Sequence, residues 1–169
     1  MKIYLIGFMG CGKTTLGKKT AAKMSFNFID LDKEIEARAG MSIPDYFKEF
    51  GEAAFRVLER ETLQSSEFPL NSIIATGGGA PCFFDNMQWM NTNGTTVYLS
   101  LSPKALASRL ETAAEERPLL QQLKGDALVE FITQKLSERE MFYKQASLTA
   151  QGINITPEKL ISILNLPSS

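Results

Sequence analysis

The stretch LIGFMGCGKTT at residues 5–15 constrains the fold of this chain more than any other part of the sequence. Gly7, then four residues, then Gly12, Lys13 and Thr14 form the G-x-x-x-x-G-K-[ST] pattern of a phosphate-binding loop, directly after an apolar run. In such loops the glycines let backbone N–H groups point at phosphate oxygens, and the dipole of the following helix also favours anions. The predicted nucleotide contacts are Gly10, Cys11, Gly12, Lys13, Thr14 and Thr15, with Lys13 on the outer phosphates and Thr14 on Mg²⁺.

A second interpretation of the same stretch is an export signal. Lys2, a short apolar core and then Gly10-Cys11 loosely resemble the start of a bacterial lipoprotein. The apolar run is marginal and breaks at Gly7, and a basic amphipathic helix follows it instead of a cleavage site. Removal of the segment would also take away the first strand, so we favour the phosphate loop.

The composition narrows the chemistry that is available. A chain of 169 residues with 44% hydrophobic content suits one domain over 1–169, and no run approaches the ~18 apolar residues of a membrane span. The net charge of −1, without long Lys or Arg blocks, predicts no nucleic-acid or membrane partner. Two cysteines are too few for a disulfide scaffold, which favours the cytoplasm, and we expect a monomer. Because the chain has no histidine, Ser-His-Asp chemistry and His-ligated zinc are excluded.

Strand and helix patterns alternate along the whole chain. Strands are predicted at 2–7, 26–30, 71–76 and 95–101, with 147–150 and 153–156 as candidates for the last one. Helices are predicted from residue 13 and over 32–40, 42–51, 52–67, 102–116, 126–146 and 157–164. This alternation is typical of an α/β fold whose parallel sheet is covered on both faces.

A phosphate loop indicates a nucleotide but does not name the reaction. GTP-binding switches carry an N-K-x-D signature that this sequence lacks, so ATP with Mg²⁺ is favoured. Asp30 and Asp32 follow the second predicted strand, at the edge of a parallel sheet where ligands bind. One carboxylate could support the metal and the other could accept a hydrogen bond from a hydroxyl group. The alternative is that Asp32 only caps the next helix.

Three further features are compatible with phosphoryl transfer. Gly77, Gly78 and Gly79 follow a predicted strand, so that their backbone can approach a ligand, although a plain turn is the alternative. Arg56 could be a surface ion pair, and Arg117 could lie in a solvated linker. Cations are nevertheless what a transferred phosphoryl group requires, because its charge must be stabilised.

The ordered set of motifs resembles the shikimate kinase family across essentially the whole chain. The motifs are the GxxGxGKTT loop, FIDLD, the arginine after GEAAF, TGGG after a strand, RPLL, and Arg139 four residues before Tyr143. The resemblance implies a three-layer P-loop kinase fold like that of the nucleoside monophosphate kinases, with a five-stranded parallel sheet flanked by helices. It also implies a substrate-binding helical segment around residues 33–62 and a lid near residues 112–125.

The resemblance further implies that the γ-phosphate of ATP is transferred to the 3-hydroxyl of shikimate, on the route to chorismate. Asp32 would bind the shikimate hydroxyls and is the candidate base, with Lys13 and Arg117 as the other catalytic residues. The remaining assignments are shikimate contacts from Arg56, Gly78, Gly79 and Arg139, phosphate contacts from Arg117, an adenine contact from Arg109, and support of Mg²⁺ by Asp30 with Thr14.

The sequence departs from the family pattern at Leu31, at Cys11 and after Tyr143, and the last departure leaves the adenine contacts near Asn154 open. Two other functions remain open as well. A related small-metabolite kinase, such as one acting on gluconate, would share the phosphate loop and the lid. A non-catalytic nucleotide-binding module would not require the combination of Asp32, Arg56 and Arg139.

Overall fold

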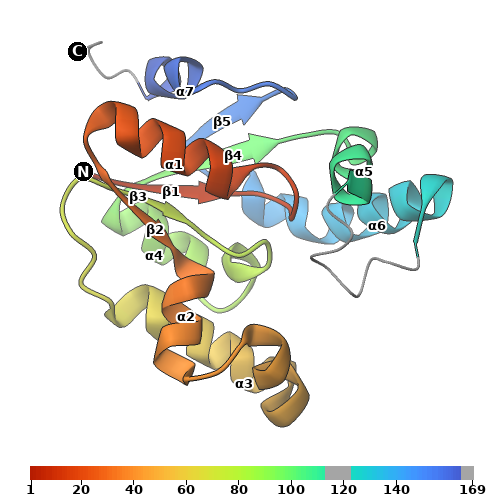
Figure 1. Cartoon of the computed structure of the whole chain (residues 1–169), viewed down its shortest axis with the longest axis horizontal. Helices are drawn as coiled ribbons and strands as arrows, with labels where there is room; N and C mark the ends of the chain where they lie inside the picture. The colour runs from red at the N-terminus through yellow and green to blue at the C-terminus, as the bar shows by residue number, and fades with distance from the viewer. Residues whose placement is uncertain (113–122, 165–169) are drawn as a thin grey trace.

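A computed structural model describes residues 1–112 and 123–164 of the chain, and its centre is a five-stranded parallel sheet (Figure 1). The strands are β1 (Lys2–Ile6), β2 (Asn27–Asp30), β3 (Ser72–Ala75), β4 (Thr95–Ser100) and β5 (Leu148–Gln151). Their order in the sheet is β2-β3-β1-β4-β5, so that β1 lies between β3 and β4. Ile3 pairs with Ile73 on one side and with Thr95 on the other. The prediction of a parallel α/β sheet is confirmed.

The helices are α1 (Lys13–Met24), α2 (Leu31–Ala39), α3 (Ile43–Ser65), α4 (Asn86–Asn93), α5 (Pro103–Thr112), α6 (Gly125–Tyr143) and α7 (Pro157–Ile163), with a 3₁₀ turn η1 at Ala80–Cys82. The two helices predicted over 42–51 and 52–67 are joined at Gly51, whose φ of 83° and ψ of 173° produce a kink. The sequence did not predict η1 or α4, which follow the glycine run of the third strand.

Two layers of helix cover the sheet. Figure 1 shows α1 in front of the sheet, with α7 beside it, and α4 and α6 behind it. The helices α2 and α3 extend away from the carboxyl end of β2 and pack against each other. Together they span residues 31–65, so the residues of the substrate-binding segment expected around 33–62 lie in these two helices and the turn between them.

Two of the alternatives that the sequence left open are wrong. The segment 153–156 is not a strand: Gly152 has a φ of 124°, and Thr156 caps α7 by accepting a hydrogen bond from Lys159 N at 3.2 Å. Asp32 is not the cap of α2, because Asp30 holds that position and accepts a hydrogen bond from Asp32 N at 3.1 Å. The carboxylate of Asp32 is therefore not required for the start of the helix.

No helix among the described residues is long and apolar enough to cross a membrane. The apolar start of the chain packs instead in the core of the sheet, where Ile3, Leu5 and Ile6 of β1 are fully buried.

Tyr4 is the one residue of β1 that places a polar group in this core. Its side chain is fully buried beside Trp89, and its hydroxyl has no hydrogen-bond partner within residues 1–112 and 123–164. Burial raises the pKa of Tyr4 to about 12, so the hydroxyl stays protonated.

We expect Tyr4→Phe to stabilise the protein by about 1 kcal/mol, because it removes a buried polar group without creating a large cavity. Urea unfolding of the two proteins measures the difference. A clear loss of stability in Tyr4→Phe would mean that the hydroxyl is satisfied by buried water.

Candidate active site

The loop between β1 and α1 has the backbone geometry of an anion cradle. Gly10 and Gly12 have φ values of 80° and 96°, in the left-handed region that favours glycine. A Cβ on Gly12 would also lie only 2.9 Å from Arg109 Nη1. Thr14 and Thr15 are exposed in the first turn of α1, where the helix dipole favours a bound anion.

Lys13 is buried and turned toward its own loop. Its Nζ donates hydrogen bonds to Gly7 O at 2.6 Å and Phe8 O at 3.0 Å, and a weaker one to Cys11 Sγ at 3.6 Å. To reach a phosphate, the ammonium group must exchange these carbonyl oxygens for phosphate oxygens. Cys11 is buried, so it presents its backbone rather than its thiol to a ligand.

One cavity of about 700 Å³ brings most of the predicted residues together. It lies at the carboxyl ends of β1, β2 and β3, as expected for a parallel sheet. Its walls include Gly10, Gly12, Lys13, Thr14, Thr15, Asp30, Asp32, Gly77, Gly78 and Arg109. The phosphate loop and the two aspartates therefore face the same space.

Arg109 connects this cavity to a second one of about 270 Å³. Its guanidinium donates to Cys11 O at 3.2 Å and to Ile153 O, and so links the phosphate loop to the segment between β5 and α7. Asn154 and Pro157 line the smaller cavity from that segment, and Thr15 lines it from α1. This arrangement suits a nucleoside attached to phosphates that lie in the loop.

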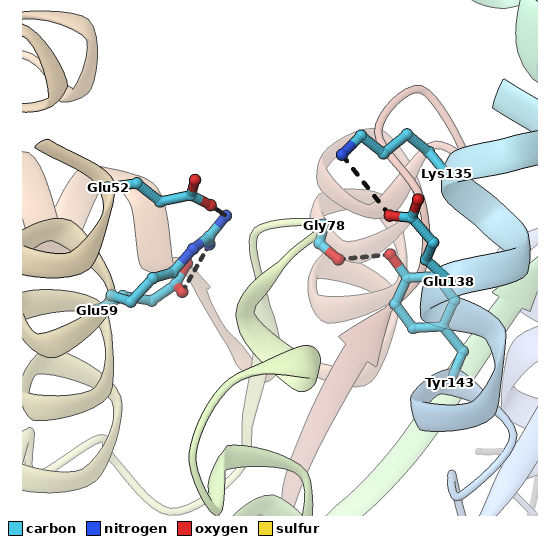
Figure 2. Close-up of polar contacts among 7 residues, drawn as sticks. Glu52, Glu59, Gly78, Lys135, Glu138 and Tyr143 are labelled. Atoms are coloured by element: carbon cyan, nitrogen blue, oxygen red, sulfur yellow. Dashed lines mark hydrogen bonds and ion pairs between the residues drawn. The ribbon is translucent and has the colours of Figure 1, made fainter. Parts of the chain in front are cut away.

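Arg56 lies on α3 between two carboxylates. Its Nη1 is 2.9 Å from Glu59 Oε1, and its Nη2 is 3.3 Å from Glu52 Oε1 (Figure 2). Arg56 and Glu59 are buried, whereas Glu52 is exposed. The Nε of Arg56 has no hydrogen-bond partner among the described residues. The cation is therefore held by one buried and one exposed carboxylate of its own helix.

Glu59 was missed by the sequence analysis, although it is almost fully buried. Its Oε2 and Asp32 Oδ1 lie 3.3 and 3.1 Å from the position that a Cβ on Gly77 would take. Burial raises the pKa of Glu59; Arg56 and Arg139 oppose this effect, and Asp32 adds to it. The available signal was its place one turn after Arg56, among the buried residues Phe55, Thr62 and Leu63 of α3.

Gly78 and Gly79 lie between two guanidinium groups. A Cβ on Gly79 would be 2.7 Å from Arg56 Nη1 and Nη2, and a Cβ on Gly78 would be 3.4 Å from Arg139 Nη1. Figure 2 shows Gly78 joined to Tyr143 of α6, whose hydroxyl donates to the Gly78 carbonyl. On the same helix Lys135 pairs with Glu138 at 3.7 Å. The structure thus brings Arg56, Arg139 and the glycine run into one cluster.

Two further predictions from the sequence concern the lid with Arg117 and the Mg²⁺ site. Arg117 and almost all of the segment expected as a lid lie outside the described residues. Within residues 1–112 and 123–164 no group of three or more acidic or cysteine side chains could hold a metal by itself. Thr14 and Asp30 do line the same cavity, and a hydroxyl and a carboxylate suit a hard cation that also binds phosphate oxygens.

The comparisons with known proteins agree on one family. The sequence model of the shikimate kinase family matches residues 9–164. The chain is 51% identical to the shikimate kinase of Bacteroides fragilis over 148 residues, which cover 87% of this chain and 82% of the relative. It is 48% identical to the shikimate kinase of Parabacteroides distasonis over 149 residues, covering 88% and 86% of the two chains.

Solved structures give the same result. The crystal structure of shikimate kinase from Bacteroides thetaiotaomicron is similar with a TM-score of 0.92 and 44% identity, covering 98% of this chain and 99% of that one. Shikimate kinase from Acinetobacter baumannii in complex with shikimate has a TM-score of 0.83 and 31% identity, with 97% and 90% coverage. Deoxyadenosine kinase from M. mycoides, at 19% identity and a TM-score of 0.56, shares the fold alone.

The burial of Glu59 gives a stability prediction with a definite sign. Because its folded-state pKa is raised, Glu59 favours the folded protein most below its unfolded pKa, and this contribution is lost as the pH rises through the folded value. We therefore expect the unfolding free energy of the wild type to fall relative to that of Glu59→Gln as the pH rises from the ordinary glutamate pKa of 4.5 to neutrality. Urea unfolding across this range measures the difference.

The matched control is Glu52→Gln, since Glu52 pairs with the same arginine but is exposed. A difference between wild type and Glu59→Gln that does not change with pH would contradict the prediction.

Proposed function

The chain belongs to the shikimate kinase family of phosphotransferases, and we propose that it transfers the γ-phosphoryl group of ATP to the 3-hydroxyl of shikimate. The products are then shikimate 3-phosphate and ADP, on the route to chorismate and the aromatic amino acids. The carrying observation is the cavity that places the phosphate loop opposite Asp32 and the glycine run. Arg56 and Arg139 border that glycine run.

The chemistry of shikimate suits this arrangement. The molecule has one carboxylate and several ring hydroxyls, and it must be held with one hydroxyl aimed at the γ-phosphate. The guanidinium groups of Arg56 and Arg139 flank Gly78 and Gly79, and planar guanidinium groups bind carboxylates through paired hydrogen bonds. The carboxylate therefore lies at this end, and the hydroxyls point toward Asp32.

Asp32 is the residue that we assign to the acceptor hydroxyl. It accepts a hydrogen bond from that hydroxyl, orients its oxygen and takes up the proton as the new P–O bond forms. With no histidine in the chain, a carboxylate is the natural acceptor for this proton. Because Asp30 caps α2, Asp32 can serve the substrate without a competing structural role at the helix start.

Nucleotide binding uses the other wall of the cavity. Backbone N–H groups of Gly10, Cys11 and Gly12 cradle the phosphates, Lys13 and Thr15 bind their oxygens, and Arg109 lies against the adenine. Thr14 and Asp30 hold Mg²⁺, which when bound supplies positive charge that offsets the charge of the phosphates. We assign Arg117 the same task from the lid, although it lies outside the described residues.

The deciding experiment is an ADP-release assay with shikimate and with gluconate as acceptors. We expect ADP release with shikimate as acceptor and none with gluconate. In the same assay Arg139→Lys should raise the shikimate KM and leave the KM for ATP near normal, because an ammonium group cannot replace a bidentate guanidinium. Turnover with gluconate instead would identify a related small-metabolite kinase. Nucleotide binding without turnover of either acceptor would identify a non-catalytic module.

A second prediction tests the role of Asp32. Asp32→Asn keeps the size of the side chain but loses its charge, so kcat should fall by about 10² or more. Because Asp30 is the cap, the free energy of unfolding should change by less than about 1 kcal/mol. Initial rates at saturating shikimate and ATP, together with urea unfolding, measure both quantities.

Glu34→Gln is the control for this variant, since Glu34 is exposed on the same helix. Near-wild-type kcat in Asp32→Asn would leave substrate orientation and Mg²⁺ to account for the rate.

A further inference from the structure

The hydroxyl of Tyr143 makes a contact to which the proposed function assigns no role. Tyr143 is fully buried near the carboxyl end of α6, and its ring packs against Tyr98 with 5.1 Å between ring centroids. Its hydroxyl donates to the carbonyl oxygen of Gly78, across 65 positions of sequence (Figure 2). This hydrogen bond therefore connects α6 to the glycine run after β3.

The contact fixes the orientation of a whole peptide group and not only that of its carbonyl. The peptide that joins Gly78 to Gly79 is planar and trans, so its C=O and N–H point in opposite directions. When the Gly78 carbonyl faces Tyr143, the Gly79 N–H faces away from it. The N–H groups of Gly78 and Gly79 donate no hydrogen bond among the described residues, whereas the Gly79 carbonyl accepts one from Cys82 N at 2.9 Å.

The surroundings of this peptide are strongly cationic. The guanidinium of Arg56 packs on Gly79, and that of Arg139 lies beside Gly78 and over the ring of Phe8 at 5.6 Å. An N–H donor between two guanidinium groups is suited to an anion. The one anionic group of shikimate is its carboxylate.

Tyr143 remains a hydrogen-bond donor under all ordinary conditions. Burial raises its pKa far above the usual range, and this effect outweighs the opposing charge and hydrogen bonding of Arg139. The hydroxyl donates to the Gly78 carbonyl, and Arg139 precedes Tyr143 by four residues, about one turn, on the same helix face, with its guanidinium beside Gly78.

We propose that Tyr143 is a positioning residue for shikimate, whose hydroxyl orients the Gly78–Gly79 peptide beside Arg139 so that the Gly79 N–H and the guanidinium together bind the carboxylate. The inference rests on the function proposed above and adds to it a residue that does not touch the substrate. It predicts that loss of the hydroxyl weakens shikimate binding and leaves the nucleotide side unchanged.

Tyr143→Phe is the test variant and Tyr98→Phe the control, because Tyr98 belongs to the same aromatic pair but does not reach Gly78. We expect Tyr143→Phe to raise the shikimate KM about tenfold, the loss for one buried hydrogen bond, with an ATP KM near the wild-type value. The thermal shift caused by shikimate should shrink in Tyr143→Phe, and the shift caused by ADP should not. Tyr98→Phe should show neither change.

An unchanged shikimate KM in Tyr143→Phe would overturn the proposal. Equal rises in the KM values for shikimate and ATP would also overturn it, because they would indicate that Tyr143 only stabilises the fold. If Tyr143→Phe does not fold, amide hydrogen exchange on the wild-type chain decides. Shikimate, but not ADP, should then slow exchange of the peptide that contains Gly78 and Gly79, and equal exchange with and without shikimate would refute it. Failure of the proposed function is a separate result, since wild-type protein would then not turn over shikimate.

Discussion

The position of β1 at the centre of the sheet determines where the chemistry of this protein can occur. In a parallel sheet every strand ends at the same edge, and the strand order puts β1 between β3 and β4. The phosphate loop after β1 therefore lies next to the glycine run after β3, and β2 carries Asp30 and Asp32 to the same edge one strand further. Residues separated by up to 100 positions, from Met9 to Arg109, therefore line one cavity.

The second constraint is the compensation of buried charge. Lys13 and Arg56 are both largely buried, and an unpaired buried cation is strongly unfavourable. Lys13 is satisfied by carbonyl oxygens of its own loop, whereas Arg56 is paired with Glu59 one turn further along its helix. Arg56 also pairs with the exposed Glu52, while Glu59 lies near Asp32, whose negative charge adds to the rise of the Glu59 pKa.

The sequence predicted the sheet and the phosphate loop because their signals are local. Apolar runs of strand length and the spacing from Gly7 to Thr14 can be recognised without any knowledge of distant contacts. It did not predict Glu59 or the true cap of α2. Glu59 cannot be told from an exposed helical glutamate before the fold buries it, and the sequence DLD offers two aspartates, two positions apart, for one cap. Of its two candidates for the last strand, 147–150 matches β5, whereas 153–156 follows Gly152, where the chain turns away from the sheet.

The glycine run explains how two separate helices build one anion site. Arg56 comes from α3 and Arg139 from α6, and the two helices lie on opposite sides of the run. Arg56 is held by Glu59 of its own helix, Arg139 lies one turn before Tyr143 on its helix, and both guanidinium groups lie against the run itself. A side chain at Gly79 would push the guanidinium of Arg56 away, since its Cβ would lie 2.7 Å from two of the nitrogens. The spacing between the two cations is therefore set by the thickness of a backbone without side chains, which requires glycine at this position.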